Sequence, residues 1–321
     1  MFDVSFCILL KNEHQTSKNE HRKTDIEHRK TNHKHRKTNR ATVASNMMVK
    51  DKNIYTQLNN GIKMPLLGLG VYDMYKKEAE QAVSWALEIG YRLIDTAAMY
   101  ENEVEIGNAV RQGGVARNEL FITTKVHNNE QGYDKTLRAF DESQRKLNCD
   151  YIDLYLVHWP IKNTRKDTWL ALEKLYADGR VKAVGVANYL IPFLDELATY
   201  GNIVPALNQV EFSPYLYLKD LLNYCEAKQI QLQAYTPLVR GERMTDPKLV
   251  KMAQKYQKTP AQIILRWILQ RGVSAIPKSA NLARLKENFD VFDFQINPED
   301  MILIDNFNEN YRVVENPMDL F

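Results

Sequence analysis

The sequence has 321 residues, of which 44% are hydrophobic and 10% aromatic, enough to bury the core of one large barrel or two smaller domains. No apolar run approaches the ~18 residues that a membrane-spanning helix needs, so we expect no membrane span. The net charge is +3, but the part after residue 46 is nearly neutral, which disfavours nucleic-acid binding.

Residues 1–46 differ in composition from the rest of the chain, with ten lysines and arginines against five acids. Four histidines recur every seven residues, in or near copies of Glu-His-Arg-Lys-Thr: His14, His21, His28 and His35. Almost no apolar residue follows Leu10, so we expect this segment to be disordered. A basic or metal-binding arm is one alternative. In a second alternative, translation starts at Met47 or Met48 and the repeat is not part of the protein. Under all of these alternatives, we expect residues 47–321 to form the folded domain.

The three cysteines, Cys7, Cys149 and Cys225, lack Cys-x-x-Cys spacing. This pattern is typical of free thiols in a reducing compartment, and we expect a cytoplasmic protein without a metal centre. The short apolar patch at Phe6–Leu10 is followed by no small-residue cleavage site, so we expect no signal peptide.

From Ile54 onward, strand-like and helix-like segments alternate. Tyr55–Leu58 and Ile62–Met64 flank Asn59-Asn60-Gly61, which predicts a β-hairpin. Eight strand-like runs follow: Leu66–Val71, Arg92–Thr96, Leu120–Lys125, Ile152–His158, Ala183–Ala187, Ala206–Phe212, Gln231–Tyr235 and Ser274–Pro277. The segments with helical periodicity are Glu78–Ile89, Thr136–Leu147, Thr168–Ala177, Leu218–Ala227, Pro260–Gln270 and a terminal Pro298–Asn306.

Eight such repeats in roughly 220 residues favour a (β/α)8 TIM barrel over a doubly wound sheet. No Gly-x-Gly-x-x-Gly follows a strand, which argues against a Rossmann domain. The hairpin is then placed to close the bottom of the barrel. Thr259-Pro260 is a helix start, and Gly90, Gly179 and Gly272 stand where helices should end.

Polar side chains fall at the carboxyl ends of seven of these strands. In chain order they are Asp95, Lys125, His158, Asn188, Gln209, Tyr235, and Lys278 with Ser279. In a (β/α)8 barrel these ends meet on one face, where active sites lie. One polar residue at a strand end is usually a cap or an ion-pair partner, but seven strands in a row indicate a functional site.

Three separate parts of the sequence resemble the aldo-keto reductase family, and the resemblance covers residues 50–310. They are Gly90–Ala97 with Tyr100 and Glu105–Gly107, Asp150–Pro160, and Ile276–Ser279 with Arg284, Glu287 and Asn288. These are similar, in that order, to the family's first motif, its fourth-strand motif and its adenosine-phosphate site. The chain resembles the compact members, which include diketogluconate reductases and microbial prostaglandin F synthases.

The resemblance implies that aldehydes or ketones are reduced to alcohols by hydride transfer from NADPH. Tyr100 would be the general acid, and the nearby ammonium of Lys125 would lower its pKa. Asp95 would pair with Lys125 and orient it. His158 would hydrogen-bond the oxygen of the small carbonyl substrate.

The resemblance also implies a set of NADPH contacts. Lys278, Ser279 and Arg284 would hold the 2′-phosphate, because cations suit its charge. The other implied contacts are Asn188 and Gln209 to the carboxamide, Tyr235 to the nicotinamide ring, Leu238 in the following loop, and Glu287 with Asn288 to the adenine. Two positions depart from the family pattern, because Ala187 replaces a common serine and Val239 a common glycine.

Tyr72 and Trp159 follow the first and fourth strands and should line the substrate pocket. The segments after Trp159, Tyr235 and Tyr311 are short, which predicts an open pocket and a broad preference for small aldehydes. We expect a monomer or weak dimer. Two other functional classes remain open: a Schiff-base aldolase using Lys125, and an idle relative serving as a binding or structural protein, which should have lost part of the catalytic set.

Overall fold

The computed structural model describes residues 55–320, so the segment 1–46 and both candidate start methionines lie outside the described residues. Strands β1 (Tyr55–Gln57) and β2 (Lys63–Pro65) pair antiparallel and form the predicted hairpin. Gly61 in its turn has a φ of 87°, a conformation that glycine adopts without steric cost.

Eight parallel strands form the centre of the described part of the chain. They are β3 (Leu69–Gly70), β4 (Leu93–Asp95), β5 (Phe121–Val126), β6 (Ile152–Val157), β7 (Val181–Ala187), β8 (Leu207–Glu211), β9 (Gln231–Tyr235) and β10 (Ser274–Ala275). Bridges between Leu67 and Ala275 and between Gly70 and Lys278 join the two ends of this order. The sheet therefore closes on itself, and the predicted (β/α)8 barrel is confirmed.

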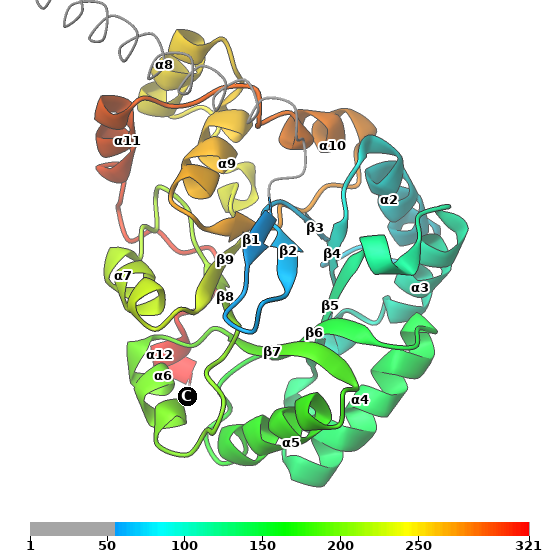
Figure 1. Ribbon diagram of the computed structural model, residues 1–321. Helices are drawn as coiled ribbons and strands as arrows, with labels where there is room; N and C mark the ends of the chain where they lie inside the picture. Colours follow the sequence, from blue (N-terminus) through cyan, green and yellow to red (C-terminus); the bar gives the residue numbers. More distant parts are fainter. Residues whose placement is uncertain (1–54, 321) are drawn as a thin grey trace, which may run out of the picture. The chain divides into compact units, whose positions relative to one another are not determined.

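Helices surround the strands, and Figure 1 shows the hairpin in front of them, at one end of the barrel. The helices are α2 (Lys76–Ile89), α3 (Glu103–Gln112), α4 (Tyr133–Leu147), α5 (Arg165–Ala177), α6 (Ile191–Ala198), α7 (Lys219–Ala227), α8 (Pro247–Tyr256), α9 (Pro260–Gln270), α10 (Leu282–Phe289), α11 (Pro298–Asp305) and α12 (Pro317–Leu320). Among the described residues, no helix is both long and apolar enough to cross a membrane.

The six predicted helices are all present, and α9 agrees at both ends. Its N-cap Thr259 accepts from the backbone of Gln262 in a full capping box. Gly90, at the end of α2, has a φ of 119°, and Gly179 and Gly272 are also left-handed. Helices α3, α6, α8, α10 and α12 were not predicted.

The hairpin covers the amino-terminal end of the barrel, as predicted. The Asn60 side chain donates to the Lys182 carbonyl at the start of β7, and the Thr56 hydroxyl donates to Gln231 at the start of β9. Leu58 of the hairpin is 3% exposed and enters the barrel core, a burial that stabilises the fold by about 1.5–3 kcal/mol. The opposite, carboxyl-terminal end is left free for the polar side chains.

Apolar side chains fill the lower part of the barrel interior. They come from the hairpin and from most strands: Leu58, Met64, Leu93, Phe121, Leu154, Leu156, Ala183, Ala187, Ala206, Leu207 and Ile276. Gly68 makes room for this core, because a Cβ there would lie 2.0 Å from the Leu93 side chain. Polar side chains replace apolar ones toward the carboxyl ends of the strands, so the site rests on a rigid apolar base.

Candidate active site

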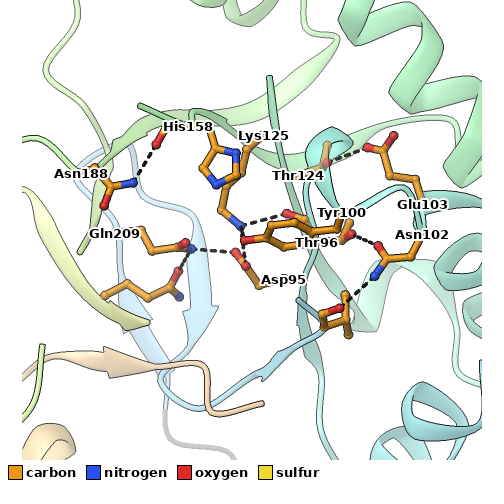
Figure 2. Close-up of polar contacts among 12 residues, drawn as sticks. Asp95, Thr96, Tyr100, Asn102, Glu103, Thr124, Lys125, His158, Asn188 and Gln209 are labelled. Carbon is orange, nitrogen blue, oxygen red and sulfur yellow. Dashed lines mark hydrogen bonds and ion pairs between the residues drawn. The ribbon is translucent and has the colours of Figure 1, made fainter. Parts of the chain in front are cut away.

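Four side chains from consecutive βα units converge at the carboxyl end of the barrel. Asp95 ends β4, Lys125 lies near the end of β5, and His158 directly follows β6. Tyr100 ends the short 3-10 turn η1 (Ala98–Tyr100) between β4 and α3. Figure 2 shows Lys125 at the centre, between the Asp95 carboxylate and the Tyr100 hydroxyl, with the His158 ring beside it. The structure therefore brings the four predicted catalytic residues together.

The ammonium group of Lys125 is fully committed to hydrogen bonds. Its Nζ lies 2.5 Å from Asp95 Oδ1, 2.9 Å from the Thr96 carbonyl oxygen and 3.3 Å from Tyr100 Oη. A lysine has three N–H donors and no acceptor, so one of them is aimed at the phenol oxygen. The hydroxyl proton of Tyr100 must then point away from Lys125.

Burial acts on both partners of the Asp95–Lys125 ion pair. It raises the pKa of Asp95 and lowers the pKa of Lys125, and each group's charge opposes the shift in the other. A second hydrogen bond, from Gln209 to Asp95 Oδ2 at 2.7 Å, also favours the carboxylate. The pair is charged because its geometry is close and the remaining oxygen is satisfied.

The net shift in the pKa of Tyr100 is upward, although the sequence led us to expect that Lys125 would lower it. Burial of the hydroxyl raises the pKa of Tyr100 well above its usual value, and the negative charge of Asp95 raises it further. The carboxylate lies on the same ammonium group, so its charge offsets that of Lys125 at the phenol. Tyr100 therefore holds its proton more tightly than an ordinary tyrosine does.

His158 is neutral. Burial lowers the pKa of its imidazole well below the usual value, and the positive charge of Lys125 lowers it further. The ring packs edge-on against Tyr100, with the centroids 5.7 Å apart. Its Nδ1 is buried and has no hydrogen-bond partner within residues 55–320. The imidazole is thus positioned next to the phenol by packing, and its ring is not engaged in a protein hydrogen bond at that nitrogen.

The depressed pKa of His158 predicts a pH-dependent contribution to stability. Below the unfolded pKa of about 6.5, the unfolded chain takes up a proton that the folded protein excludes, so acid favours unfolding. The free energy of unfolding should fall as pH drops through this window, and His158→Gln should lose part of the fall. Urea unfolding of both proteins between neutral and mildly acidic pH measures it, and identical pH slopes would contradict the prediction.

Gln209 and Gln233 form a hydrogen-bonded chain behind Asp95. The Gln209 Nε2 donates to Asp95 Oδ2 at 2.7 Å and to Gln233 Oε1 at 2.8 Å. An ionised carboxylate only accepts hydrogen bonds, so the group that Gln209 turns toward it must be the amide nitrogen. The amide oxygen of Gln209 is then the group left for other contacts, which suits its predicted contact with the carboxamide nitrogen of NADPH.

Asn188 and Tyr235, also predicted to contact the cofactor, are bound to each other. The Tyr235 hydroxyl donates to Asn188 Oδ1 at 2.8 Å, and Asn188 Nδ2 donates to the His158 carbonyl oxygen at 2.9 Å. Asn188 has a φ of 65°, which asparagine tolerates better than most residues. These bonds link the ends of β6, β7 and β9 into one rim of the site.

The predicted phosphate-binding residues lie around the start of α10. Lys278 and Arg284 are exposed and form no ion pair among the described residues, while Ser279 is buried. Asn281 caps the helix by accepting from the backbone of Arg284. Two uncommitted cations beside a helix N-terminus suit an anion, so the residues present fit a phosphate group.

The remaining predicted cofactor residues lie in two regions. Asn288 of α10 is buried, and the Glu287 carboxylate accepts from the Thr259 hydroxyl at 2.5 Å, so it faces α9. Leu238 lies half-buried in the loop after β9. In that loop Val239 has a φ of 51°, which explains why a glycine is common at this position in the family.

The two predicted pocket residues lie at the rim. Tyr72 is 56% exposed, and its ring meets that of Tyr100 edge-on, with a centroid distance of 5.1 Å. Trp159 directly follows His158 and is half-buried, and its carbonyl oxygen accepts from the Gln131 side chain. Together the rings of Tyr100 and Tyr72 form an aromatic wall that reaches from the site to solvent.

Sequence reasoning missed four buried polar residues around the site: Asn102, Glu103, Glu211 and Gln233. Glu211 accepts from the backbone of Val313 at 2.7 Å and ties the C-terminal segment to β8. Gln233 is a polar residue within a strand, as the predicted site residues are. It was missed because it lies in the middle of β9 and not at its carboxyl end. Nothing in the sequence distinguishes Asn102 and Glu103 from an ordinary helix start.

Comparison with known proteins identifies the family. The model of the Aldo/keto reductase family matches residues 66–309. The chain is 49% identical to the glyoxal reductase of Bacillus subtilis over 265 residues, 82% of this chain and 96% of the relative. It is 45% identical to the 9,11-endoperoxide prostaglandin H2 reductase of Trypanosoma cruzi over 268 residues, 82% and 95% of the two chains.

A solved structure agrees with these relatives. The crystal structure of a Bombyx mori aldo-keto reductase in complex with NADP is 36% identical, with a TM-score of 0.77, over 82% of this chain and 95% of that one. The residues matched by the family model thus include every residue predicted for the site. The chain belongs to the aldo/keto reductase family.

Proposed function

We propose that this chain is an NADP-dependent oxidoreductase that reduces small aldehydes and ketones to alcohols, with Tyr100 as the general acid. The observation that carries the proposal is the hydrogen bond from Lys125 Nζ to Tyr100 Oη, which leaves the phenol proton free to be donated to another group. Family membership supports the reductase class, and the NADP-bound Bombyx mori relative supports the cofactor.

When bound, NADPH would supply a hydride for the carbonyl carbon of the substrate. Tyr100 then gives its proton to the carbonyl oxygen, which completes the alcohol. The phenolate left behind is stabilised by Lys125, whose Nζ is already 3.3 Å from the oxygen. A proton from solvent restores the neutral phenol that the raised pKa of Tyr100 favours.

His158 orients the substrate in this proposal. Its imidazole is neutral because burial and Lys125 lower its pKa, so it is a hydrogen-bond donor without a charge of its own. Because its ring contacts that of Tyr100, a carbonyl oxygen bound at the imidazole also lies close to the phenol proton. His158 would thus select the orientation in which Tyr100 reaches the oxygen.

Several groups of the chain support NADPH as the cofactor. The amide oxygen of Gln209 is free to accept from the carboxamide because Asp95 fixes the amide nitrogen. Lys278 and Arg284 supply two positive charges for the 2′-phosphate, with Ser279 between them. Three further proposed NADPH contacts lie at the carboxyl ends of β7 and β9 or just after them: Asn188, Tyr235 and Leu238.

Arg284→Ala should weaken NADPH binding by about 10- to 100-fold, the value of one hydrogen bond to a charged group, and leave NADH binding unchanged. Lys286→Ala is the matched control, because Lys286 is also exposed on α10. Fluorescence titration of the two cofactors measures the ratio. Equal losses for NADPH and NADH would remove Arg284 from the 2′-phosphate site.

We propose small aldehydes as the preferred substrates. Tyr72 next to Tyr100 is exposed, and one relative is named as the glyoxal reductase of Bacillus subtilis, glyoxal being a small dicarbonyl. The test is NADPH oxidation against a panel of aldehydes, ketones and sugars. A protein that binds NADPH but reduces no carbonyl in the panel would contradict the proposal.

The aldolase alternative is disfavoured by the environment of Lys125. Its side chain is 0% exposed, and its three donors are bound to Asp95, the Thr96 carbonyl and Tyr100. A Schiff-base lysine must reach the substrate carbonyl as a neutral amine. An idle relative is disfavoured because the four catalytic groups are present in contact. Failure of borohydride to trap a substrate adduct would support this view.

We also propose that the protein is cytoplasmic and acts as a monomer or weak dimer. Cys149 and Cys225 are free thiols in the structure, which suits a reducing compartment. All four catalytic groups come from one chain, so the proposed chemistry needs no second copy. Sedimentation analysis at several concentrations tests the oligomeric state.

A further inference from the structure

The turn that carries Tyr100 has little apolar anchoring. Ala98, Met99 and Tyr100 are all only partly buried, and Glu101 is exposed with a φ of 54°. Without buried apolar side chains, such a segment opens easily unless hydrogen bonds hold it. The first fully buried side chain after the turn is the polar Asn102, which is 0% exposed.

Asn102 is in the N-cap position of α3, where an asparagine commonly accepts from the backbone of its own helix. Here its side chain forms no such cap. Its Nδ2 donates to the carbonyl oxygens of Val71 at 2.8 Å and Met74 at 3.0 Å, and its Oδ1 accepts from the Thr96 hydroxyl at 2.6 Å. Both amide hydrogens and the amide oxygen are thus used between loops, as Figure 2 shows in part.

The loops that Asn102 joins carry two of the proposed functional groups. The carbonyls of Val71 and Met74 flank Tyr72, and Thr96 lies between Asp95 and the Tyr100 turn. The rings of Tyr72 and Tyr100 are in edge-on contact. A shift of Asn102 would therefore move the aromatic wall and the phenol together.

The next residue fixes the same turn to the strand that carries Lys125. The Glu103 carboxylate accepts from the Thr124 hydroxyl at 2.6 Å, and Thr124 is adjacent to Lys125 in β5. Glu103 is 2% exposed, and burial raises the pKa of its carboxyl group. With Asn102 it connects the loops after β3 and β4 to the end of β5.

We propose that Asn102 is a positioning residue that sets the placement of both Tyr100 and Tyr72, so that it governs proton transfer and substrate fit without contacting substrate or cofactor. The proposal rests on the function proposed above. Lys278 lies near this region, since it bridges Gly70 next to Val71. However, the Asn102 side chain bonds only Val71, Met74 and Thr96 among the described residues, and none of these groups is a proposed phosphate ligand. Loss of its contacts should therefore separate catalysis from cofactor binding.

The test is Asn102→Asp, which keeps an acceptor for Thr96 but replaces the donor to two carbonyls with a second acceptor. We expect kcat to fall about 10- to 100-fold, as for a small misplacement of a reacting group, and the substrate KM to rise. The NADPH dissociation constant should stay at the wild-type value. The isotope effect on kcat with deuterated NADPH should increase, because the chemical step becomes slower.

Asn108→Asp is the matched control, since Asn108 lies on α3 but its side chain donates to Glu80 on α2. It should keep the wild-type kcat and isotope effect. If Asn102→Asp does not fold, Thr96→Val removes the hydroxyl donor to Asn102 Oδ1 and should give a smaller change in the same direction.

Wild-type kcat in a folded Asn102→Asp protein would overturn the inference, as would equal losses of catalysis and NADPH affinity. If Asn102→Asp does not fold, wild-type kcat in Thr96→Val would overturn it too. Absence of NADPH-dependent reduction in the unmodified protein would instead contradict the proposed function.

Discussion

Tyr100→Phe should abolish reduction of carbonyl substrates while NADPH still binds. The phenylalanine keeps the ring that contacts His158 and Tyr72 but removes the hydroxyl that supplies the proton in the proposed mechanism. Loss of a general acid costs about a hundredfold to ten-thousandfold in rate. Steady-state NADPH oxidation and a separate NADPH titration measure the two parts of this prediction.

Tyr55→Phe is the matched control for this experiment. Tyr55 is exposed in the hairpin at the opposite end of the barrel and should behave as wild type. The melting temperature of Tyr100→Phe must also be compared, because one N–H of Lys125 loses its acceptor, at a cost of about 1–3 kcal/mol. Retained turnover in a folded Tyr100→Phe protein would remove Tyr100 from the role of acid.

Breaking the Asp95–Lys125 pair on one side should cost more stability than any other single change considered. Asp95→Ala leaves the ammonium, and Lys125→Met leaves the carboxylate, without a counter-charge in a site where Lys125 is 0% exposed. Removing one partner of a buried ion pair costs about 3–5 kcal/mol. Urea unfolding at neutral pH gives the loss, and either variant should also lack reductase activity.

The double variant distinguishes a buried pair from two independent residues. Asp95→Ala with Lys125→Met removes both charges, so its loss of stability should be smaller than the sum of the single losses by about 0.5–3 kcal/mol. The exposed pair of Lys174 in α5 and Asp178 at its C-cap is the control and should show little coupling. Additive losses at Asp95 and Lys125 would show that their charges are not coupled.

Prediction and structure agree best for features that follow from the alternation of side chains along a strand. Asp95, Lys125 and Gln209 were predicted to meet because inward-facing residues at the carboxyl ends of barrel strands share one face. Their contacts, 2.5 Å between Lys125 and Asp95 and 2.7 Å between Gln209 and Asp95, confirm the convergence. The residues of a strand that face the barrel interior can be predicted from the sequence of that strand alone, without knowing which strands lie beside it.

Helix α3 is an element that the local sequence pattern did not predict. Gly107 lies in its interior, and glycine lowers helix propensity, so the segment gives a weak helical signal. The structure needs glycine there, because a Cβ would lie 2.4 Å from the carbonyl oxygen of Leu147 at the end of α4. The close approach of two helices far apart in the sequence selects this residue.

By itself the sequence determined the barrel, the hairpin beneath it and the set of polar side chains at one end, because these follow from alternation and strand order along the chain. Only the tertiary structure decided the direction of the pKa shift of Tyr100, the orientation of the Gln209 amide and the use of Asn102 between loops. Each depends on burial and on partners from other strands, since a pKa or an amide orientation is fixed by the groups that surround it in space.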